Sequence, residues 1–417
     1  MTLNRRAFIQ STAAVAAAAS STTLWAADTI KIGFVTPLTG PLALFGEADK
    51  WTVEQMKQSF KNGITVAGKK YSVEILIKDS QSNPNRAAEV ASDLILKDKI
   101  TLMVVTSTPD TTNPVCDVCE LNEMPCISTN CPWQPWFFGR KGDPAKGFVW
   151  THHFFWGLED VIGNFTNGWK SLKTNKKVGG LFPNDADGNA WGDKTLGFPK
   201  PLSEMGFTLT DPGRYQNGTQ DFSAQIAAFK KDGVDIITGV MIPPDAKTFL
   251  SQAKQQGLNP KAITLGKALL FPVGIEALGE LGAGLSTEVW WSPSHPFTSS
   301  LTKQSAKDLA AAYEKGNNKQ WTQPVGFAHA LFEVAADTFK RAKSIKPADL
   351  RDAIAATDMD TIVGRVKWGG PGPFKNVSKT PLVLGQWVKG TKFKYDLVIV
   401  NNELAKNIPT GGALKPM

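Results

Sequence analysis

The chain has 417 residues, 42% of them hydrophobic and 20% charged, a composition that supports a large folded core and excludes a disordered protein. Its 46 Lys and Arg residues outnumber 38 Asp and Glu residues, but both signs are spread along the chain without a nucleic-acid-binding basic tract. Four Cys residues exclude a disulfide-dense small protein, and no apolar run approaches the roughly 18 residues of a membrane span. We expect about two to three domains and no nucleic-acid partner.

Residues 1–27 have the organisation of an export signal. Arg5 and Arg6 precede an Ala-rich stretch over residues 13–19, and the small residues Ala26 and Ala27 close the segment. The Arg-Arg-x-Phe order with a weakly apolar core is typical of a twin-arginine (Tat) signal, with the Sec route as the alternative. The signal predicts a protein of the bacterial cell envelope, in the periplasm, where cysteines meet oxidising conditions.

After the signal, short β-rich runs alternate with stretches of helical period. The predicted strands cover residues 30–35, 73–77, 102–105, 125–129, 177–182, 208–211, 234–240 and 262–265. The predicted helices cover residues 48–60, 84–95, 112–123, 190–205, 222–231 and 245–256. This alternation predicts the α/β class, with two doubly wound parallel-sheet units.

Open parallel sheets bind ligands at the carboxyl ends of their strands. The loops that follow the predicted strands are therefore the candidate binding loops. They cover residues 36–46, 106–112, 129–136, 183–192, 241–245 and 266–272.

Several motifs, in this order and spacing, resemble those of the leucine/isoleucine/valine-binding proteins, the type I periplasmic solute-binding proteins of ABC importers. The motifs are Ile30-Lys31-Ile32-Gly33 with Thr39-Gly40-Pro41, Asp79 to Pro84, Thr112-Asn113-Pro114, Asp221 to Ile226, and Gln252-Ala253 with Gly257-Leu258. The resemblance covers essentially all of residues 29–370.

The resemblance implies two α/β domains joined by a three-crossing hinge, with the solute trapped between them. Carried onto this chain, the crossings fall near 150, 285 and 361. One domain would comprise residues 29–149 and 286–360, and the other residues 150–285 and 361–417. A non-enzymatic, cofactor-free and monomeric receptor is implied, one that delivers a small solute to an ABC permease at the inner membrane. A sensor that docks on a chemoreceptor or a sensor kinase is the alternative.

The resemblance also assigns ligand contacts in the first domain. Phe45 corresponds to the aromatic residue of the first ligand loop. Ser107 and Thr108 precede a helix N-terminus, where hydroxyls and backbone N–H groups suit a carboxylate. In the loop after the fourth strand, the usual hydroxyl position is lost, and Asn130 and the bulky Trp133 are the candidate contacts.

In the second domain, Trp191 corresponds to an aromatic contact, and Met241 or Ile242 replaces another one. Amino-acid binders of the family place an acid after the strand that ends near residue 265, but Lys267 stands in this stretch. A buried ammonium without a countercharge is costly, so Lys267 favours an anion. We therefore expect a small carboxylate, an aromatic acid or an amide-like solute, although Asp185 or Asp245 could supply the charge an amino acid needs.

Four cysteines lie close together in the sequence, at Cys116, Cys119, Cys126 and Cys131. In an oxidising compartment this group predicts one or two disulfides, with Cys116–Cys131 as the preferred pair. A Cys-ligated metal or redox centre is the alternative, although the spacing matches no known cluster pattern and we expect no metal. The adjacent residues 152 and 153, both His, are expected in the hinge or the cleft.

Overall fold

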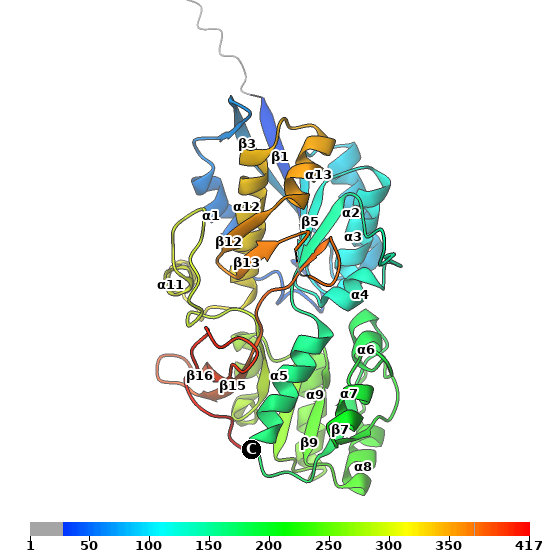
Figure 1. The fold of residues 1–417 in the computed structure, drawn as a ribbon. Helices are drawn as coiled ribbons and strands as arrows, with labels where there is room; N and C mark the ends of the chain where they lie inside the picture. Colours follow the sequence, from blue (N-terminus) through cyan, green and yellow to red (C-terminus); the bar gives the residue numbers. More distant parts are fainter. Residues whose placement is uncertain (1–27, 371) are drawn as a thin grey trace, which may run out of the picture.

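The computed structural model describes residues 28–370 and 372–417, so the predicted export signal lies outside the described residues. The chain forms two lobes, and each is built on its own seven-stranded sheet (Figure 1). Helices pack on these sheets, as the alternation of strand and helix patterns predicts. The predicted α/β class with two doubly wound units is confirmed.

The first sheet belongs to the upper lobe of Figure 1 and is parallel except at its last strand. β1 pairs in parallel with β3 on one side and β4 on the other, whereas β2 joins β3 as an antiparallel edge. The strands in spatial order are β14 (Val377–Ser378), β6 (Thr151–Phe154), β5 (Cys126–Thr129), β4 (Leu102–Thr106), β1 (Thr29–Thr36), β3 (Lys69–Asp79) and β2 (Ile64–Val66).

Alternating residues of β1 face two different helical layers, because successive side chains of a strand point to opposite faces. Phe34 packs edge-on against Phe332, with 5.6 Å between the ring centres. Val35 faces the other layer. The first layer holds α1 (Asp49–Ser59) and α12 (Pro324–Arg341), and the second holds α2 (Pro84–Leu96), α3 (Pro109–Leu121) and α4 (Trp133–Phe137).

The first lobe also receives a long segment from the later part of the chain. This segment contains α11 (Ala306–Asn317), α12, α13 (Pro347–Ala355) and the antiparallel pair β12 (Asp358–Thr361) and β13 (Gly364–Lys367). α12 packs against α1, α11 and α13, which anchors the segment on the first sheet.

The second sheet is parallel over five strands and carries two antiparallel strands at one edge. The strands in spatial order are β16 (Tyr395–Asn401), β15 (Val383–Lys389), β11 (Ser286–Val289), β10 (Ala262–Gly266), β9 (Ile236–Val240), β7 (Lys177–Leu181) and β8 (Thr208–Thr210). α5 (Leu158–Lys170) packs on β11, β15 and β16, and α8 (Ser223–Asp232) packs on β7 and β8.

The remaining helices of the second lobe are short, except for α9 (Pro243–Gln255). The others are α6 (Ala186–Trp191), α7 (Pro199–Glu204), α10 (Pro272–Glu276) and the 3₁₀ turn η1 (Gly279–Gly282). The single helix predicted over residues 190–205 is wrong, because α6 ends at Trp191 and α7 begins at Pro199. Gly197 and Pro199 interrupt the pattern, and proline is tolerated only in the first turn of a helix.

The sheets correct the predicted positions of the three crossings. β6 and β14 both belong to the first sheet, whereas β11 belongs to the second. The chain therefore leaves the first sheet after Phe154, returns after Val289 and crosses again after Ser378, rather than near 150, 285 and 361. The first two predicted positions lie close to the observed ones, whereas the third is clearly too early, because β14 pairs with β6 more than 200 positions earlier in the chain.

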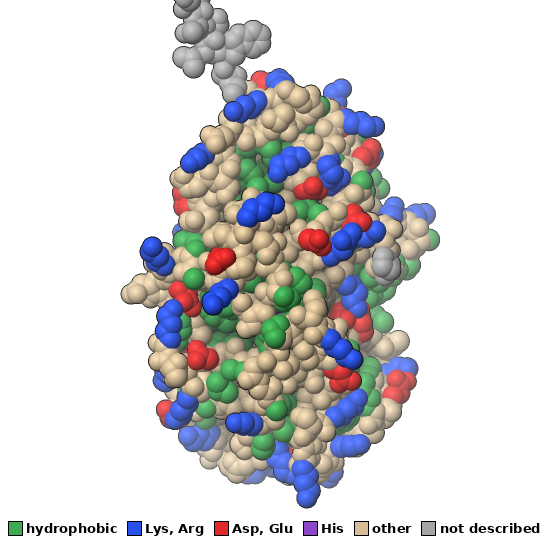
Figure 2. Space-filling view, turned by 60° about the vertical axis from the view of Figure 1, so that its left-hand side comes forward, with side chains coloured by type: hydrophobic (Ala, Val, Ile, Leu, Met, Phe, Trp, Pro, Cys, Tyr) green, Lys and Arg blue, Asp and Glu red, His purple; other side chains and the backbone are tan. Residues whose placement is uncertain are grey.

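The surface carries both signs of charge. Figure 2 shows Lys and Arg side chains interspersed with Asp and Glu side chains on the displayed face, without a large patch of one sign. No helix within residues 28–370 and 372–417 is both long enough and apolar enough to cross a membrane.

Candidate ligand-binding site

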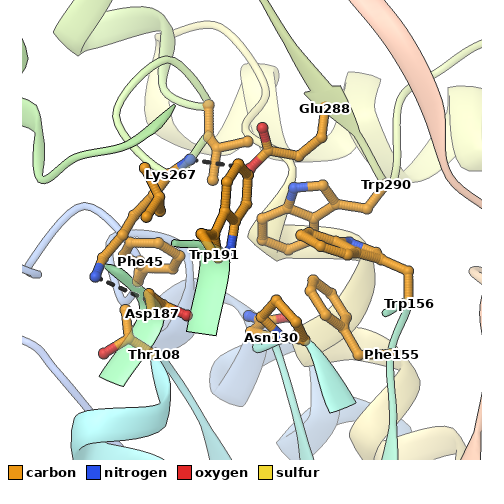
Figure 3. A pocket seen from close by; sticks show the side chains of 13 residues that line it. Phe45, Thr108, Asn130, Phe155, Trp156, Asp187, Trp191, Lys267, Glu288 and Trp290 are labelled. Atoms are coloured by element: carbon orange, nitrogen blue, oxygen red, sulfur yellow. Dashed lines mark hydrogen bonds and ion pairs between the residues drawn. The ribbon is translucent and has the colours of Figure 1, made fainter. Parts of the chain in front are cut away.

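A pocket with about 310 Å³ of empty space, part of it open to solvent, lies between the two lobes, where strands of both sheets end. Thr108 and Asn130 follow β4 and β5 of the first sheet, and Lys267 follows β10 of the second. The cavity therefore occupies the place where open α/β sheets bind ligands. It is lined by Phe45, Thr108, Asn130, Pro132, Phe155, Trp156, Asp187, Trp191, Val240, Lys267, Leu270, Glu288 and Trp290 (Figure 3).

Two of the polar lining residues hold an unusual backbone conformation. Asn130 has φ +71° and Lys267 has φ +67°, in the left-handed region that non-glycine residues rarely adopt. Each follows directly on the strand that precedes it, so the turn directs the side chain into the cavity. The Asn130 amide donates to the Thr106 hydroxyl, and the Lys267 backbone N–H donates to Glu288 Oε1 over 2.9 Å. Strain of this kind persists where surrounding bonds hold it, often at functional sites.

Aromatic rings form most of the apolar wall. Trp156, Trp191 and Trp290 face the same space, and Phe45 and Phe155 complete the wall (Figure 3). Contacts between rings hold them in place. Trp191 stacks on Phe198 with 5.2 Å between ring centres, and Phe155 packs edge-on against Trp290 at 5.1 Å.

A buried ion-pair cluster forms the polar side of the cavity. Lys267 Nζ lies 3.0 Å from Asp187 Oδ2 and 3.3 Å from Asp185 Oδ2, and all three side chains are less than one-tenth exposed. Burial alone would lower the pKa of Lys267, but Asp185, Asp187 and Asp110 together raise it above the usual lysine range. The ammonium therefore stays charged, and its charge is already matched by carboxylates.

Asp187 remains the weakly ionised member of this cluster. Burial raises its pKa to about 7, with Asp185 and Asp110 adding to the rise and Lys267 opposing it. Its second oxygen, Oδ1, is buried and has no hydrogen-bond partner in the described structure. This oxygen is available to a ligand.

Glu288 supplies a second carboxyl group from β11. Its Oε1 accepts the Lys267 backbone N–H, and its Oε2 accepts the Thr287 hydroxyl over 2.8 Å. Burial raises the pKa of Glu288 to about 7. Within the described ranges, no ion pair joins this carboxyl to a Lys or Arg side chain. The site therefore has more carboxyl groups than cations.

Other buried polar atoms of the lining lack partners in the described structure. They are the indole N–H groups of Trp156, Trp191 and Trp290, the hydroxyl of Thr108 and the side-chain oxygen of Asn130. Buried polar groups are normally hydrogen-bonded, so a group of unpaired donors and acceptors around one cavity indicates a ligand that satisfies them.

Comparison with known proteins identifies the family that shares this architecture. Residues 29–392 match the family described as periplasmic binding protein. The chain belongs to the periplasmic binding protein family. A leucine-, isoleucine-, valine-, threonine- and alanine-binding protein of Pseudomonas aeruginosa is 23% identical over 379 residues, covering 88% of this chain and 93% of the relative.

Solved structures share the fold at lower identity. A branched-chain amino acid transporter substrate-binding protein of Streptococcus pneumoniae, in complex with isoleucine, has a TM-score of 0.70 and 19% identity, covering 89% of this chain and 100% of that one. A solute-binding protein of an ABC transporter from Rhodopseudomonas palustris BisB5, in complex with 3,4-dihydroxybenzoic acid, has a TM-score of 0.71 and 18% identity, covering 90% and 98%. The resemblance to leucine/isoleucine/valine-binding proteins is confirmed, and the family consists of solute-binding proteins rather than enzymes.

In this periplasmic binding protein, the predicted contacts divide into two groups. Phe45, Thr108, Asn130, Trp191 and Lys267 all line the cavity, although their contact with a ligand stays a prediction. The other four, Ser107, Trp133, Met241 and Ile242, do not line it.

Ser107 and Trp133 lie away from the cavity lining. Ser107 is buried beneath the α3 N-terminus, where its carbonyl accepts the Thr112 hydroxyl. Trp133 packs on Phe374 and donates its indole N–H to Glu159 over 3.0 Å. The role of Trp133 is therefore to join α4 to the start of α5. Its position within a strand-end loop did not reveal that the ring packs into the core beside Phe374.

Met241 and Ile242 are also absent from the lining, and Val240, the last residue of β9, is the residue of this loop that reaches the cavity. Lys267, from which an anion preference was inferred, is not a free cation, because Asp185 and Asp187 already pair with it. The proposed substitute Asp245 instead accepts the Gly218 backbone N–H.

Sequence reasoning missed Phe155, Trp156, Asp187, Glu288 and Trp290 as site residues. The sequence shows the aromatic run that contains Trp156, but it does not show that this run crosses from one lobe to the other. Glu288 and Trp290 lie beyond the predicted boundary at 285. The sequence signal that could have identified Glu288 is a glutamate at the end of a β-rich run, between small residues and an aromatic residue.

The cysteine group is buried in the first lobe, and none of its four members is among the lining residues of the described structure. All four thiols are free, and the Sγ atoms of Cys116 and Cys126 lie 4.0 Å apart, so the preferred Cys116–Cys131 pair is not the arrangement found. In residues 28–370 and 372–417, no group of three or more His, Cys, Asp and Glu side chains is placed to hold a metal ion.

The adjacent histidines of β6 are core residues rather than hinge or cleft residues. The His153 ring bonds to the Ser128 hydroxyl at 2.9 Å and to the Cys131 carbonyl at 2.8 Å. Burial lowers the pKa of both His152 and His153 to about 3, so both rings are neutral.

Proposed function

We propose that this protein is the extracytoplasmic receptor of an ABC importer, which captures a small solute between its lobes and delivers it to a permease. The cavity built from both sheets carries the proposal, because a ligand there contacts both lobes at once. A ligand that binds both lobes favours the closed arrangement over the open one. The solutes named in relatives, branched-chain amino acids and hydroxybenzoates, set the size range to test.

Contacts across the lobes support closure as the binding motion. The Ala186 backbone N–H of α6 donates to Asp110 of α3 over 3.3 Å, beside the cavity. At the other side, Gln134 of α4 accepts the Leu158 backbone N–H of α5 over 2.8 Å. Opening about the crossings at 155–157, 290–292 and 379–382 would separate Asp110 from Ala186. Ligand exchange would require that separation.

Binding and closure can be measured together. The protein spanning residues 28–417 is mixed with amino acids, aromatic and aliphatic carboxylates, and organic amines, and its thermal unfolding and small-angle X-ray scattering are recorded. A solute at about 100 times its Kd stabilises the protein by about 2.7 kcal/mol, and its complex should have a smaller radius of gyration than the free protein. Stabilisation without compaction would contradict capture by closure.

Delivery requires a cellular measurement. Uptake of the labelled solute is compared in cells with and without the gene for this protein. Loss of uptake at low solute concentration supports the importer role. Normal uptake combined with loss of a chemotactic or transcriptional response would instead support the sensor.

Export through the twin-arginine route and a monomeric state belong to the same proposal. Replacing Arg5 and Arg6 by Lys keeps the charge but removes the Arg pair, and it should retain the precursor in the cytoplasm. Export that continues unchanged would favour the Sec route. Light scattering of the purified protein should give the mass of one chain.

A further inference from the structure

The residues of the cavity wall indicate a narrower class of ligand than the family membership does. Three indole rings from separate parts of the chain, Trp156, Trp191 and Trp290, surround one space, and two carboxyl groups, Glu288 and Asp187, lie at its margin (Figure 3). Aromatic faces and carboxylates share one preference, since both attract positive charge. Lys267, the one lysine of the lining among the described residues, is already paired with two aspartates.

We propose that the ligand carries an alkylated ammonium group, which sits among the indole rings of Trp156, Trp191 and Trp290 opposite Glu288. This inference rests on the proposed receptor function and names its solute class.

Two features favour an alkylated nitrogen over a primary ammonium. A primary ammonium needs hydrogen-bond acceptors for three N–H groups, whereas the unpaired acceptor-only oxygens among the described lining residues are two, Asp187 Oδ1 and Asn130 Oδ1. An alkylated nitrogen presents carbon to its surroundings and fits against ring faces. Around the three Trp residues, the wall is completed by the apolar side chains of Phe45 and Phe155, with Val240, Leu270 and Pro132 elsewhere in the lining.

The unpaired donors add a second requirement. The indole N–H groups of all three Trp residues and the Thr108 hydroxyl are buried without partners, and each of these residues lines the cavity. A hydroxyl, ester or carboxylate oxygen on the ligand would accept from them. The expected solute is therefore an alkylated ammonium compound with an oxygen substituent, of which choline and glycine betaine are simple examples.

A simple anion fits this site poorly. A carboxylate without a cationic group would enter a cavity whose one ammonium is matched by Asp185 and Asp187, with the Glu288 carboxyl close by. Burying it there would place like charges together without a countercharge.

The test compares ligands that differ by one property. Isothermal titration calorimetry is run with a panel of alkylated ammonium compounds that includes choline and glycine betaine. The comparison ligands are 3,3-dimethylbutanol (a neutral isostere of choline), leucine and 4-hydroxybenzoate. At least one alkylated ammonium compound should bind, and a member with a neutral isostere should bind about tenfold or more tightly than that isostere.

Three results would overturn the proposal: binding of leucine or 4-hydroxybenzoate but of no alkylated ammonium compound, equal binding of a cation and its neutral isostere, or no binding by any cation of the panel. The first result, together with closure in scattering, would leave the receptor function intact. Absence of binding by every solute together with normal uptake would remove both proposals.

Variants separate a charge effect from a packing effect. Glu288→Gln keeps an oxygen for the Lys267 N–H, and Thr287 can still donate to the Leu265 carbonyl over 2.9 Å. This variant should lose about tenfold in affinity for the cation and little for its neutral isostere. Asp49→Asn is the matched control, since Asp49 is also buried but does not line the cavity. Equal effects of both substitutions would overturn the role of Glu288.

Trp191→Leu provides an independent test should Glu288→Gln fold poorly. It removes a ring face while leaving an apolar side chain, so it should weaken the cation more than the isostere. Circular dichroism confirms that the variant is folded. Equal weakening of both ligands would overturn the aromatic contribution.

A pH profile gives a readout that loss of packing would not produce. The charged groups facing Glu288 and the cavity are Lys267 after β10, Asp185 and Asp187 at α6, and Asp110 on α3, and the Cys131 thiol near Asp187 stays neutral because burial raises its pKa. A cation favours the ionised form of Glu288, so binding releases protons and affinity should rise from pH 6 to pH 8. Glu288→Gln should reduce this slope, leaving the part due to Asp187. An unchanged slope would contradict the proposal.

Discussion

Lys267 and Asp187 form a buried ion pair between the turn after β10 and helix α6 of the second lobe, with 3.0 Å between Nζ and Oδ2 and side chains each 5% exposed. The two residues are 80 positions apart in the chain. Their pairing turns a lysine at the ligand edge into a structural cation, and it leaves Glu288 as a carboxyl that faces the cavity without a cationic partner among the described residues. The charge preference of the site follows from this arrangement.

Replacing Lys267 by Met should destabilise the fold rather than only alter ligand affinity. Removal of one partner of a buried ion pair leaves unmatched buried carboxylates and costs about 3–5 kcal/mol. The free energy of unfolding is measured by denaturant titration. Lys261→Met is the control, because the exposed pair of Lys261 with Asp235 should contribute less than about 1 kcal/mol. Equal losses in the two variants would show that the Lys267 cluster is not a structural ion pair.

Asp49 provides a pH-dependent stability difference that can be isolated by substitution. Burial raises its pKa to about 7 from the ordinary 3.8, and its Oδ2 accepts the Thr36 hydroxyl over 2.5 Å. Because the folded state holds this proton more tightly than the unfolded state, the contribution is full below about pH 4 and falls as pH rises through 7.

Asp49→Asn keeps an acceptor for Thr36 and has no proton to lose. The variant should therefore gain stability over the natural protein by about 1.4 kcal/mol per pH unit between pH 5 and pH 7. The four buried His residues, whose pKa values are lowered, act in the opposite direction but cancel in this difference. Denaturant titrations at pH 5, 6 and 7 provide the measurement, and a constant difference would contradict the raised pKa.

Gly266 should be intolerant of even a methyl group. A Cβ at this position would lie 2.4 Å from Trp191 Cη2 and 3.3 Å from Glu288 Oε1. Trp191 cannot move easily, since it stacks on Phe198. Gly266→Ala should therefore cost about 1–3 kcal/mol of stability and weaken ligand binding, as judged by thermal unfolding and calorimetry. The matched Gly274→Ala, where the nearest atom would be 3.8 Å away, should do neither.

The four cysteines should resist thiol reagents in the folded protein. All are buried, and burial raises the pKa of each thiol. We expect no labelling under native conditions and labelling of the free thiols only after unfolding. Should a preparation contain a disulfide, peptide mapping should find Cys116–Cys126, whose sulfurs are 4.0 Å apart, and not Cys116–Cys131. Rapid native labelling, or a mapped Cys116–Cys131 bond, would contradict this arrangement.

Local patterns in the sequence were sufficient for the fold class and for part of the site. Strand and helix periods depend on which residues within a short stretch are apolar, and the alternation of the two periods determines a doubly wound sheet. Phe45, Thr108, Asn130, Trp191 and Lys267 lie in loops predicted at the carboxyl ends of strands, and the resemblance to the family singled them out within those loops. The order of motifs along the chain indicated the family.

The tertiary structure alone decided which charges meet and which strands belong together. β14 joins the first sheet by pairing with β6, between residues more than 200 positions apart, so the third crossing could not be placed from local pattern. Asp187 pairs with Lys267 because α6, which follows β7, meets the turn after β10. Glu288 and Trp290 reach the cavity from the end of β11, the strand beside β10. The charge preference of a binding site depends on the distances between its side chains. The spacing of residues within one segment of the sequence does not determine their distances to residues of another segment.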